Sequence, residues 1–325
     1  MYVRKPILHI ATAFGLALCA TGAGAQVNYP SQPIKMVVPF PPAGGTDVLT
    51  RLVVNEVTLK DNKWTFIVDN KPGAGGNIGM DAVAKAKKDG YTIGAGQTAN
   101  LAINPSLYSK VPFNPLTDFA PVVLLASQPL VLVVRADSSI KTLADLKNES
   151  KTRQLTMASA GAGTVGHVGG EMFAKRAGIK VMHVPYKGAG PATTDLLGGQ
   201  TDIYFATPPS VISMVKSGKL RAVAVTSAQR IEVLGNVPTV AESGYPGFVA
   251  EDWKAVVAPI GTPPEAIAKI NEAINAALAR PEVVARIKDE GGVARGGTPA
   301  QLGAFMKSEY ARWGAAVRDS GAKLD

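Results

Sequence analysis

The sequence predicts an α/β protein of two lobes with a ligand cleft between them. Its 325 residues suffice for two domains, because an ordinary domain takes about 150 residues. Short apolar segments alternate with amphipathic segments between residues 34 and 225, which is the order that builds α/β layers with right-handed crossovers. Three helical segments follow the last strand and need an earlier sheet to pack against. The second domain is therefore expected to interrupt the first.

A secretory signal peptide is predicted for residues 1–25. Arg4 and Lys5 form a basic start, residues 7–20 are mostly apolar, and the Ala-Gly-Ala of residues 23–25 is typical of a cleavage site. The apolar run is too short for a membrane span. The single cysteine, Cys19, lies in this segment, so the mature chain would hold none, which suits the bacterial periplasm.

Hydrophobic periodicity places the elements of the first lobe and then of the second. The first series comprises strands at 34–40, 65–68 and 91–95, with helices at 47–59 and 77–87. The second comprises strands at 130–134, 155–158, 181–184, 202–206 and 220–225, with helices at 166–177, 191–197 and 208–215. Residues 130–134 are continuously apolar, as expected of a strand inside a parallel sheet.

The last part of the chain is predicted to return to the first lobe. After a strand at 255–258, Thr262 and Glu265 form a capping-box pattern with Pro263 and Pro264 between them, which predicts a helix to about 278. Further helices are expected at 281–289 and, from a cap at Thr298, to about 318. The chain is expected to pass between the lobes at two crossings, near 122–127 and 247–253. Lobe 1 then comprises 26–124 and 251–325, and lobe 2 comprises 125–250.

Charge and composition exclude several classes of protein. The net charge of +9 becomes +7 when Arg4 and Lys5 are removed, and a basic surface attracts anions. No basic run of five or more residues occurs, and no aromatic residues interleave with the lysines and arginines. Nucleic acid is therefore not an expected partner.

Two glycine-rich turns at matching strand–helix junctions are the strongest candidates for a binding site. Gly44 and Gly45 precede the first helix, and Gly161 and Gly163 precede the helix at 166–177. The unpaired N–H groups of a helix start and the positive end of its dipole favour an anion. Thr46 and Thr164 are candidates for N-cap or ligand donor. We predict one anion site in each lobe, at the carboxyl ends of the strands.

Other glycine patterns leave alternatives open. Gly161, Gly163 and Gly166 match the dinucleotide fingerprint, but the following strand ends at 183–187 without the acidic residue that binds ribose, so a dehydrogenase is disfavoured. The cluster at 70–77 is either an anion nest or a loop whose glycines let the lobes approach. Tyr186 and Lys187 either face the cleft, where the lysine would pair with a carboxylate, or lie exposed.

No catalytic set is found. His167 and His183 are the only histidines outside the signal peptide, a helix separates them, and neither has a carboxylate or thiol at metal-ligand spacing. We expect His167 to act as a hydrogen-bonded donor. The sequence therefore predicts no enzyme, no metal and no cofactor.

Several motifs together resemble the extracytoplasmic solute receptors of tripartite tricarboxylate transporters, often called Bug receptors. The likeness runs from Tyr29 to the end of the chain. The motifs are Val38-Pro39-Phe40 with Gly44-Gly45-Thr46-Asp47, Val68-Asp69-Asn70-Lys71-Pro72-Gly73-Ala74-Gly75-Gly76, Asp89-Gly90-Tyr91-Thr92, Gly161-Ala162-Gly163-Thr164 with His167, Val184-Pro185-Tyr186-Lys187-Gly188 and Pro238-Thr239-Val240-Ala241-Glu242. One departure is Pro41-Pro42, which is stiffer than the family's usual residues and leaves the size of the ligand open.

The resemblance implies a periplasmic-binding fold of type II, with two Rossmann-like lobes joined by a two-segment hinge. It implies a monomeric periplasmic receptor that closes on a small carboxylate and delivers it to a membrane permease. The implied ligand-binding residues, with the two from the strand end at 186–187, are Phe40, Ala43, Gly44, Gly45, Thr46, Asp47, Ser159, Ala160, Gly161, Gly163, Thr164, His167, Tyr186 and Lys187. A receptor for another class of transporter and an exported enzyme on the same scaffold are the alternatives.

Overall fold

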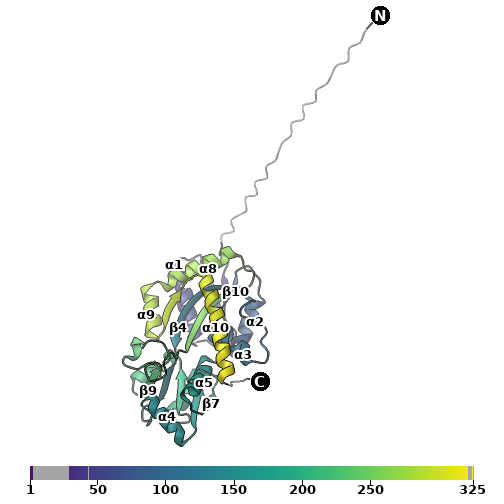
Figure 1. The fold of residues 1–325 in the computed structure, drawn as a ribbon. Helices are drawn as coiled ribbons and strands as arrows, with labels where there is room; N and C mark the ends of the chain where they lie inside the picture. Colours follow the sequence, from purple (N-terminus) through teal and green to yellow (C-terminus); the bar gives the residue numbers. More distant parts are fainter. Residues whose placement is uncertain (3–28, 43, 321–323, 325) are drawn as a thin grey trace.

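A computed structural model describes residues 1, 2, 29–42, 44–320 and 324. The described chain forms two β-sheets, each with its own helices, stacked along the long axis of the molecule (Figure 1). The predicted signal peptide lies outside the described residues except for Met1 and Tyr2. Within the described part of the chain, no helix has the length and apolar character needed to cross a membrane.

The first sheet has six strands in the order β11-β4-β10-β3-β1-β2. They are β1 (Ile34–Val38), β2 (Phe66–Asn70), β3 (Thr92–Gln97), β4 (Phe119–Pro129), β10 (Glu251–Pro259) and β11 (Val293–Gly296). β1 is parallel to β2 and β3, whereas β10 runs antiparallel to both β3 and β4. A late strand therefore lies in the middle of a sheet that the start of the chain begins.

Helices from both ends of the chain cover this sheet. α1 (Gly45–Lys60), α8 (Pro264–Leu278) and α9 (Pro281–Asp289) pack together over one face. A second group of helices shares a separate hydrophobic cluster and comprises α2 (Asn77–Ala84), η2 (Ala99–Ile103), α3 (Asn104–Leu107) and α10 (Pro299–Ser320). α10 crosses the front of β4 in Figure 1. The prediction that the C-terminal helices pack on the sheet begun at Ile34 is confirmed.

The second sheet has five strands in the order β7-β6-β8-β5-β9. They are β5 (Val131–Arg135), β6 (Leu155–Ser159), β7 (Val181–Pro185), β8 (Ile203–Ala206) and β9 (Leu220–Val225). Its helices are α4 (Leu143–Thr152), α5 (Val165–Ala177), α6 (Ala189–Leu197) and α7 (Ile212–Lys216), with short turns η3 (Pro208–Ser210) and η4 (Glu232–Leu234).

The predicted parallel setting of the strand at 130–134 is wrong. β5 pairs antiparallel with both of its neighbours, β8 and β9. Its apolar run follows from burial on both faces, since Val131, Leu132, Val133 and Val134 have no exposed surface. Burial of this kind is common in parallel sheets but does not itself fix the direction of a strand.

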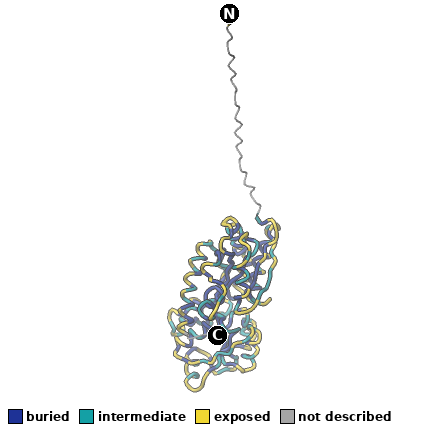
Figure 2. Tube along the Cα trace, turned by 90° about the vertical axis from the view of Figure 1, so that its right-hand side faces the viewer, coloured by how far each residue is buried: buried dark blue, intermediate teal, exposed yellow. Residues whose placement is uncertain are grey.

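One hydrophobic core runs through both halves of the molecule. Val37 and Met80 of the first sheet region belong to the same cluster as Leu132, Met157 and Phe173 of the second. Buried residues accordingly extend through the interior of both halves (Figure 2).

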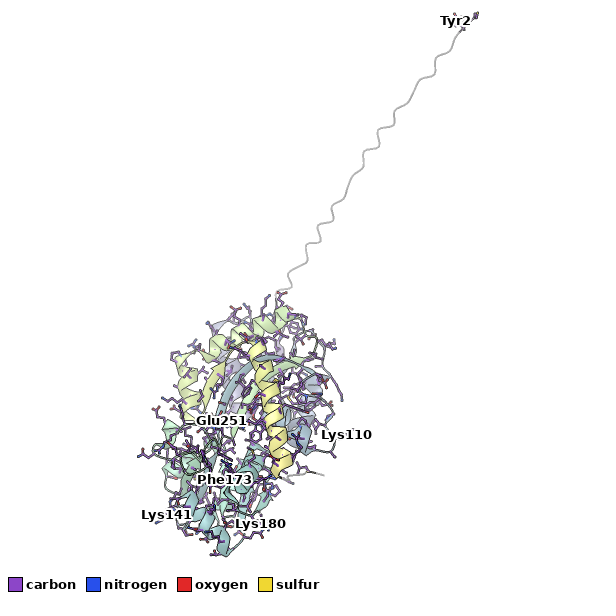
Figure 3. All side chains as sticks on the ribbon, viewed as in Figure 1. Tyr2, Lys110, Lys141, Phe173, Lys180 and Glu251 are labelled. Atoms are coloured by element: carbon purple, nitrogen blue, oxygen red, sulfur yellow. The ribbon has the colours of Figure 1, made fainter. Side chains whose placement is uncertain are left out.

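The two chain crossings lie side by side next to one buried threonine. Thr226 Oγ1 accepts a hydrogen bond of 2.7 Å from the Leu130 amide and also bonds the Ala250 carbonyl, while the Ala250 amide donates to the Thr226 carbonyl over 3.0 Å. The first crossing was expected at 122–127, but these residues lie inside β4, which pairs with β10 as far as Pro129. Glu251 begins β10 near the middle of the view in Figure 3, whereas Lys141 and Lys180 lie toward the end remote from the first sheet.

The predicted capping box at Thr262 does not form, whereas the predicted cap at Thr298 forms with reciprocal hydrogen bonds to Gln301. Gln301 donates its amide to Thr298 Oγ1 over 3.2 Å, and the Thr298 amide donates back to Gln301 Oε1 over 2.8 Å. Pro263, not Thr262, is the N-cap residue of α8, and Thr262 Oγ1 donates to the Pro259 carbonyl instead. The Thr262 hydroxyl is therefore bonded within a turn before the helix and does not cap α8.

Candidate functional site

The first glycine turn presents the start of α1 to open space. Gly44 is the N-cap residue in an extended conformation, and no described side chain caps the helix. The first-turn N–H groups of a helix lack intrahelical partners, so they are available to a ligand. A Cβ placed on Gly45 would meet nothing within 4 Å. Ala43, also predicted here, lies outside the described residues.

Asp47 and Thr46 hold this turn in shape. The buried Asp47 carboxylate accepts a bifurcated hydrogen bond from Arg51 Nε, with 3.0 Å to each oxygen, and Asn70 Nδ2 donates both to Asp47 Oδ1 (2.9 Å) and to the Phe40 carbonyl (3.0 Å). Thr46 Oγ1 donates to Gln97 Oε1 and is not the N-cap. Both side chains, predicted as ligand contacts, connect the turn to β2 and β3.

The second turn is shaped by glycines and capped by Thr164. Gly161 and Gly163 have φ angles of 145° and 80°, which L side chains rarely adopt. Thr164 Oγ1 accepts from the His167 amide over 3.4 Å and donates to the Gly161 carbonyl over 2.7 Å, so its predicted N-cap role is confirmed. A Cβ on Gly166 would lie 2.4 Å from the Phe205 carbonyl oxygen. The last glycine of the dinucleotide-like pattern thus serves close packing.

The two histidines that the sequence separates by a helix are in contact. Their rings stack with centroids 3.8 Å apart and planes 12° apart, because β6 and β7 pair in parallel next to the start of α5. His167 Nδ1 accepts from the Gly163 amide over 3.2 Å, so the proton of the neutral ring is on Nε2, and the donor role of His167 stays a prediction for that nitrogen. Ser159 Oγ lies 2.6 Å from His183 Nε2, and Ser159 has no exposed surface.

Both histidines are neutral at pH 7. Burial, reinforced by the charge of His183, lowers the pKa of His167 to about 3, and burial lowers the pKa of His183 to about 4. The turn therefore presents backbone dipoles and neutral rings to a ligand. A bound anion would be held by these dipoles and not by a charged histidine.

These shifts predict a loss of stability in mild acid. Since the unfolded histidines take up protons near pH 6.5 and the folded ones do not until about pH 4 and 3, stability is full above pH 6.5 and falls as the pH drops toward 4. A fully buried histidine contributes about 1.4 kcal/mol per pH unit in that window, and the partly exposed His183 contributes less because solvent screens it. We expect the free energy of unfolding to fall by about 2 to 4 kcal/mol between pH 7 and 5. Urea titrations of the wild type and of H167N/H183N measure this. An equal slope in both proteins would contradict the assignment.

The strand end at 186–187 is joined to the second turn by backbone hydrogen bonds. The Tyr186 amide donates to the Ser159 carbonyl and the Gly188 amide to the Ala160 carbonyl, each over 3.0 Å. Burial and a hydrogen bond to the Asp195 carboxylate raise the pKa of Tyr186 to about 12. Lys187 is exposed, as a side chain would be either at an open cleft or on the outer surface, so both alternatives stay predictions.

The second turn contacts the first lobe through residues that the sequence did not single out. A Cβ on Gly163 would lie 3.0 Å from Leu107 and 3.2 Å from Asn104 Oδ1. Asn104 Nδ2 in turn donates to the Gly75 carbonyl (3.0 Å) and to Asn77 Oδ1 (2.8 Å). Gln97 is the last residue of β3, and Asn100 and Asn104 lie in the helical segment that follows this strand. Their position at or after the end of a buried strand is the signal that could have identified them.

The glycine cluster at 70–77 allows side chains to approach closely, which is nearer to the second alternative than to an anion nest. A Cβ on Gly76 would lie 2.6 Å from Asn100 Nδ2 and 3.1 Å from Phe40 Cζ, and one on Gly75 would lie 2.9 Å from Asn104 Nδ2. Contacts of these glycines join the ends of β1, β2 and β3. Asn104 then extends the contact to the second lobe at Gly163.

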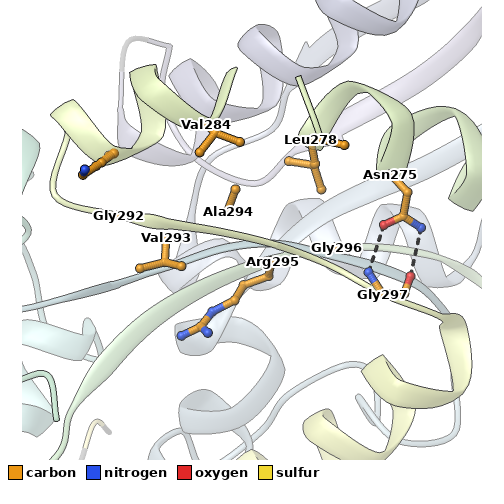
Figure 4. Close-up of a pocket in the computed structure, with 11 residues that line it drawn as sticks. Asn275, Leu278, Val284, Gly292, Val293, Ala294, Arg295, Gly296 and Gly297 are labelled. Atoms are coloured by element: carbon orange, nitrogen blue, oxygen red, sulfur yellow. Dashed lines mark hydrogen bonds between the residues drawn. The ribbon is translucent and has the colours of Figure 1, made fainter. Parts of the chain in front are cut away.

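Two cavities lie away from these turns. One of about 450 Å³ is lined by α8, α9 and β11, where Asn275 hydrogen-bonds the backbone of Gly297 (Figure 4). The other, of about 730 Å³, lies between the end of α5, residues 246–249 and α10. The described residues contain no group of three or more His, Cys, Asp or Glu side chains that could hold a metal ion.

The chain forms two α/β halves joined by two adjacent crossings, and its solved structural neighbours include the periplasmic binding protein BugD, at 34% identity and a TM-score of 0.83. The chain belongs to the tripartite tricarboxylate transporter receptor family, TctC, whose family model matches residues 50–322. The family consists of periplasmic solute-binding receptors and not of enzymes.

Named relatives and solved structures agree with this assignment. The protein BugT of Bordetella pertussis is 40% identical over 317 residues, which cover 95% of this chain and 97% of BugT. The structure of Rhodopseudomonas palustris Rpa4515 with adipate has a TM-score of 0.86 and 32% identity, and covers 91% of this chain and 100% of its own. MatC of the same organism with bound malate has a TM-score of 0.81 and 31% identity, and covers 89% and 100%.

Proposed function

We propose that this receptor captures a small organic carboxylate between its two lobes and delivers it to a membrane permease of the tripartite type. The carrying observation is that α1 and α5 both start on glycine turns after strands, and that Asn104, which bonds the loop at Gly75 and Asn77 in the first lobe, contacts Gly163 of the second turn. A carboxylate between the lobes would receive backbone N–H groups and positive dipole ends from both sides. The adipate and malate bound to the two Rhodopseudomonas proteins support this ligand class.

The protein is expected to act in the periplasm as a monomer. We expect the segment 1–25 to direct export to the periplasm and to be removed there. The binding residues are those predicted in the two turns, with Asp47 and Thr46 acting through the shape of the first turn. No cofactor or metal takes part in the proposed binding.

A thermal-shift screen tests the ligand class. The mature protein is melted with monocarboxylates, dicarboxylates, tricarboxylates, acidic amino acids, sugars and amines. A ligand at about 100 times its dissociation constant adds roughly 2.7 kcal/mol to the free energy of unfolding. We expect at least one carboxylate to produce such a shift and to be recovered unchanged after prolonged incubation. Stabilisation only by sugars or amines, or a new product, would refute the proposal.

Closure of the lobes is a second expected outcome. We propose that lobe 1 (26–124 and 251–325) and lobe 2 (125–250) rotate about the adjacent crossings at Leu130 and Ala250, because among the described residues only these two segments pass from one sheet to the other. The predicted boundary after residue 124 precedes the end of β4, so the bend itself is expected at Leu130. Small-angle scattering should give a smaller radius of gyration with saturating ligand than without. Equal radii would exclude hinge closure.

A further inference from the structure

A charged pair is buried in the central strand of the first sheet. Lys254 Nζ lies 2.7 Å from Asp252 Oδ2, and the two residues are 3% and 5% exposed. A buried ion pair often stabilises a protein no better than apolar residues of the same size would, because both charges lose their hydration. Stability alone therefore gives little reason for this pair.

The pair lies beside the first turn of the candidate site. Lys254 stands opposite Gln97 in the antiparallel pairing of β10 with β3, and directly opposed residues project from the same face of a sheet. Gln97 Oε1 accepts the hydrogen bond from Thr46 in the first turn of α1. Asp252, two residues before Lys254, projects from the same face. The charged pair is thus one strand away from the start of α1.

One atom of the pair lacks a partner. Asp252 Oδ1 is buried and has no hydrogen-bond partner among the residues that the structure describes. Buried carboxylate oxygens are nearly always hydrogen-bonded, so an unpartnered one indicates a donor that comes from elsewhere. Lys254 carries three N–H donors, of which the bond to Asp252 Oδ2 uses one. The pair can therefore offer an acceptor and a donor at one place.

We propose, on the basis of the proposed function, that Asp252 and Lys254 recognise a hydroxyl group on the carboxylate ligand. The hydroxyl donates to Asp252 Oδ1, and a remaining Lys254 N–H donates to the hydroxyl oxygen or to the adjoining carboxylate, whose other side faces the start of α1. An ammonium group would fit less well, because Lys254 already neutralises Asp252 and a second cation would lie close to it at low dielectric. The ligand is then a hydroxycarboxylate rather than a plain dicarboxylate or an amino acid.

Three four-carbon dicarboxylates test this choice, since succinate, malate and aspartate differ only in a hydrogen, a hydroxyl or an ammonium at one carbon. Titration calorimetry at pH 7.5 should give a dissociation constant for malate at least tenfold lower than for succinate and for aspartate, because an unpaired buried acceptor penalises the ligand that lacks the donor. Equal affinities, or tightest binding of aspartate, would overturn the inference while leaving carboxylate binding intact. Failure of every carboxylate would instead overturn the proposed function.

Variants assign the preference to these residues. D252N should reduce the preference for malate over succinate to less than threefold, mainly by weakening the binding of malate. Because an unpaired Lys254 could destabilise the fold, D252N/K254M is measured beside it, and both are checked by melting. E251Q is the matched control: Glu251 precedes Asp252, projects from the other face and pairs with Arg295 over 3.6 Å. Retention of the malate preference in both pair variants, or its loss in E251Q, would refute the assignment.

Discussion

Replacing Gly45 with aspartate is expected to abolish ligand binding while the protein stays folded. The new carboxylate would occupy the start of α1, where the ligand carboxylate is proposed to bind, and would repel it. The position tolerates a side chain, since a Cβ there meets nothing within 4 Å. A negative charge at a helix N-terminus favours the helix by about 0.3 to 1 kcal/mol, so the melting temperature without ligand should not fall. Lost binding is thereby separated from lost folding.

Thermal melts with a carboxylate at about 100 times its wild-type dissociation constant measure the effect. The wild type should gain roughly 2.7 kcal/mol and Gly45→Asp almost none, whereas Gly45→Ala, the control for size, should keep most of the gain. Lys187→Ala should lose about 1 kcal/mol or less, because Lys187 is exposed. If ligand stabilised Gly45→Asp as much as the wild type but no longer stabilised Lys187→Ala, Lys187 would be the main contact of the ligand carboxylate.

Gly163 is the less suitable of the two glycines for this test. Its φ of 80° strains any L side chain, and a Cβ would lie 3.0 Å from Leu107 of the other lobe. Aspartate there would disturb the turn and the contact between the lobes in addition to adding charge. The sequence gives no sign of this difference, because the neighbour that matters lies 56 positions earlier in the chain.

Elements with local signals were predicted well. The helix at Pro281–Asp289 and the strand at Leu220–Val225 were predicted with the bounds that the structure gives, because a proline opens the helix and turns bound the strand. The strands β4 and β11 were missed. Pro121 and Pro129 interrupt the apolar pattern of β4, and its pairing with β10 contains irregularities of register. Their partners come from the far end of the chain, which no local pattern reveals.

The candidate site likewise combines local features, which the sequence predicts, with contacts between distant residues, which it does not. Glycine turns at strand ends are local features, and the structure places both at helix starts. The side chains that fix their shape are held by distant partners: Asp47 by Asn70, and His167 by ring stacking on His183. Such contacts depend on which strands become neighbours. The buried pair of Asp252 and Lys254 belongs to this class as well, since an alternating strand pattern would place charges on the solvent side.

The attachment of α10 to the second crossing is expected to depend on one carboxylate, that of Glu309. Its Oε2 accepts from the indole nitrogens of Trp253 in β10 (2.8 Å) and Trp313 (2.9 Å), and Arg312 donates to both carboxylate oxygens over 2.8 Å. Arg312 also donates to the Val249 carbonyl over 3.0 Å, immediately before the crossing at Ala250. Glu309, Trp253 and Trp313 are all at least nine-tenths buried. The carboxylate therefore joins the last helix, the central strand and the crossing.

Glu309→Ala should lower the free energy of unfolding by about 4 kcal/mol, because it leaves two indole donors and a guanidinium without their acceptor in a buried place. Urea unfolding at pH 7.5 measures the loss. Glu265→Ala is the control: Glu265 pairs with Lys269 on the exposed side of α8, and its loss should cost less than about 0.5 kcal/mol. Glu309→Gln keeps an oxygen for the indoles but not the charge that Arg312 faces, so its loss should fall between the two. If Glu309→Ala cost no more than Glu265→Ala, packing of α10 alone would hold the crossing, and the carboxylate would be incidental to it.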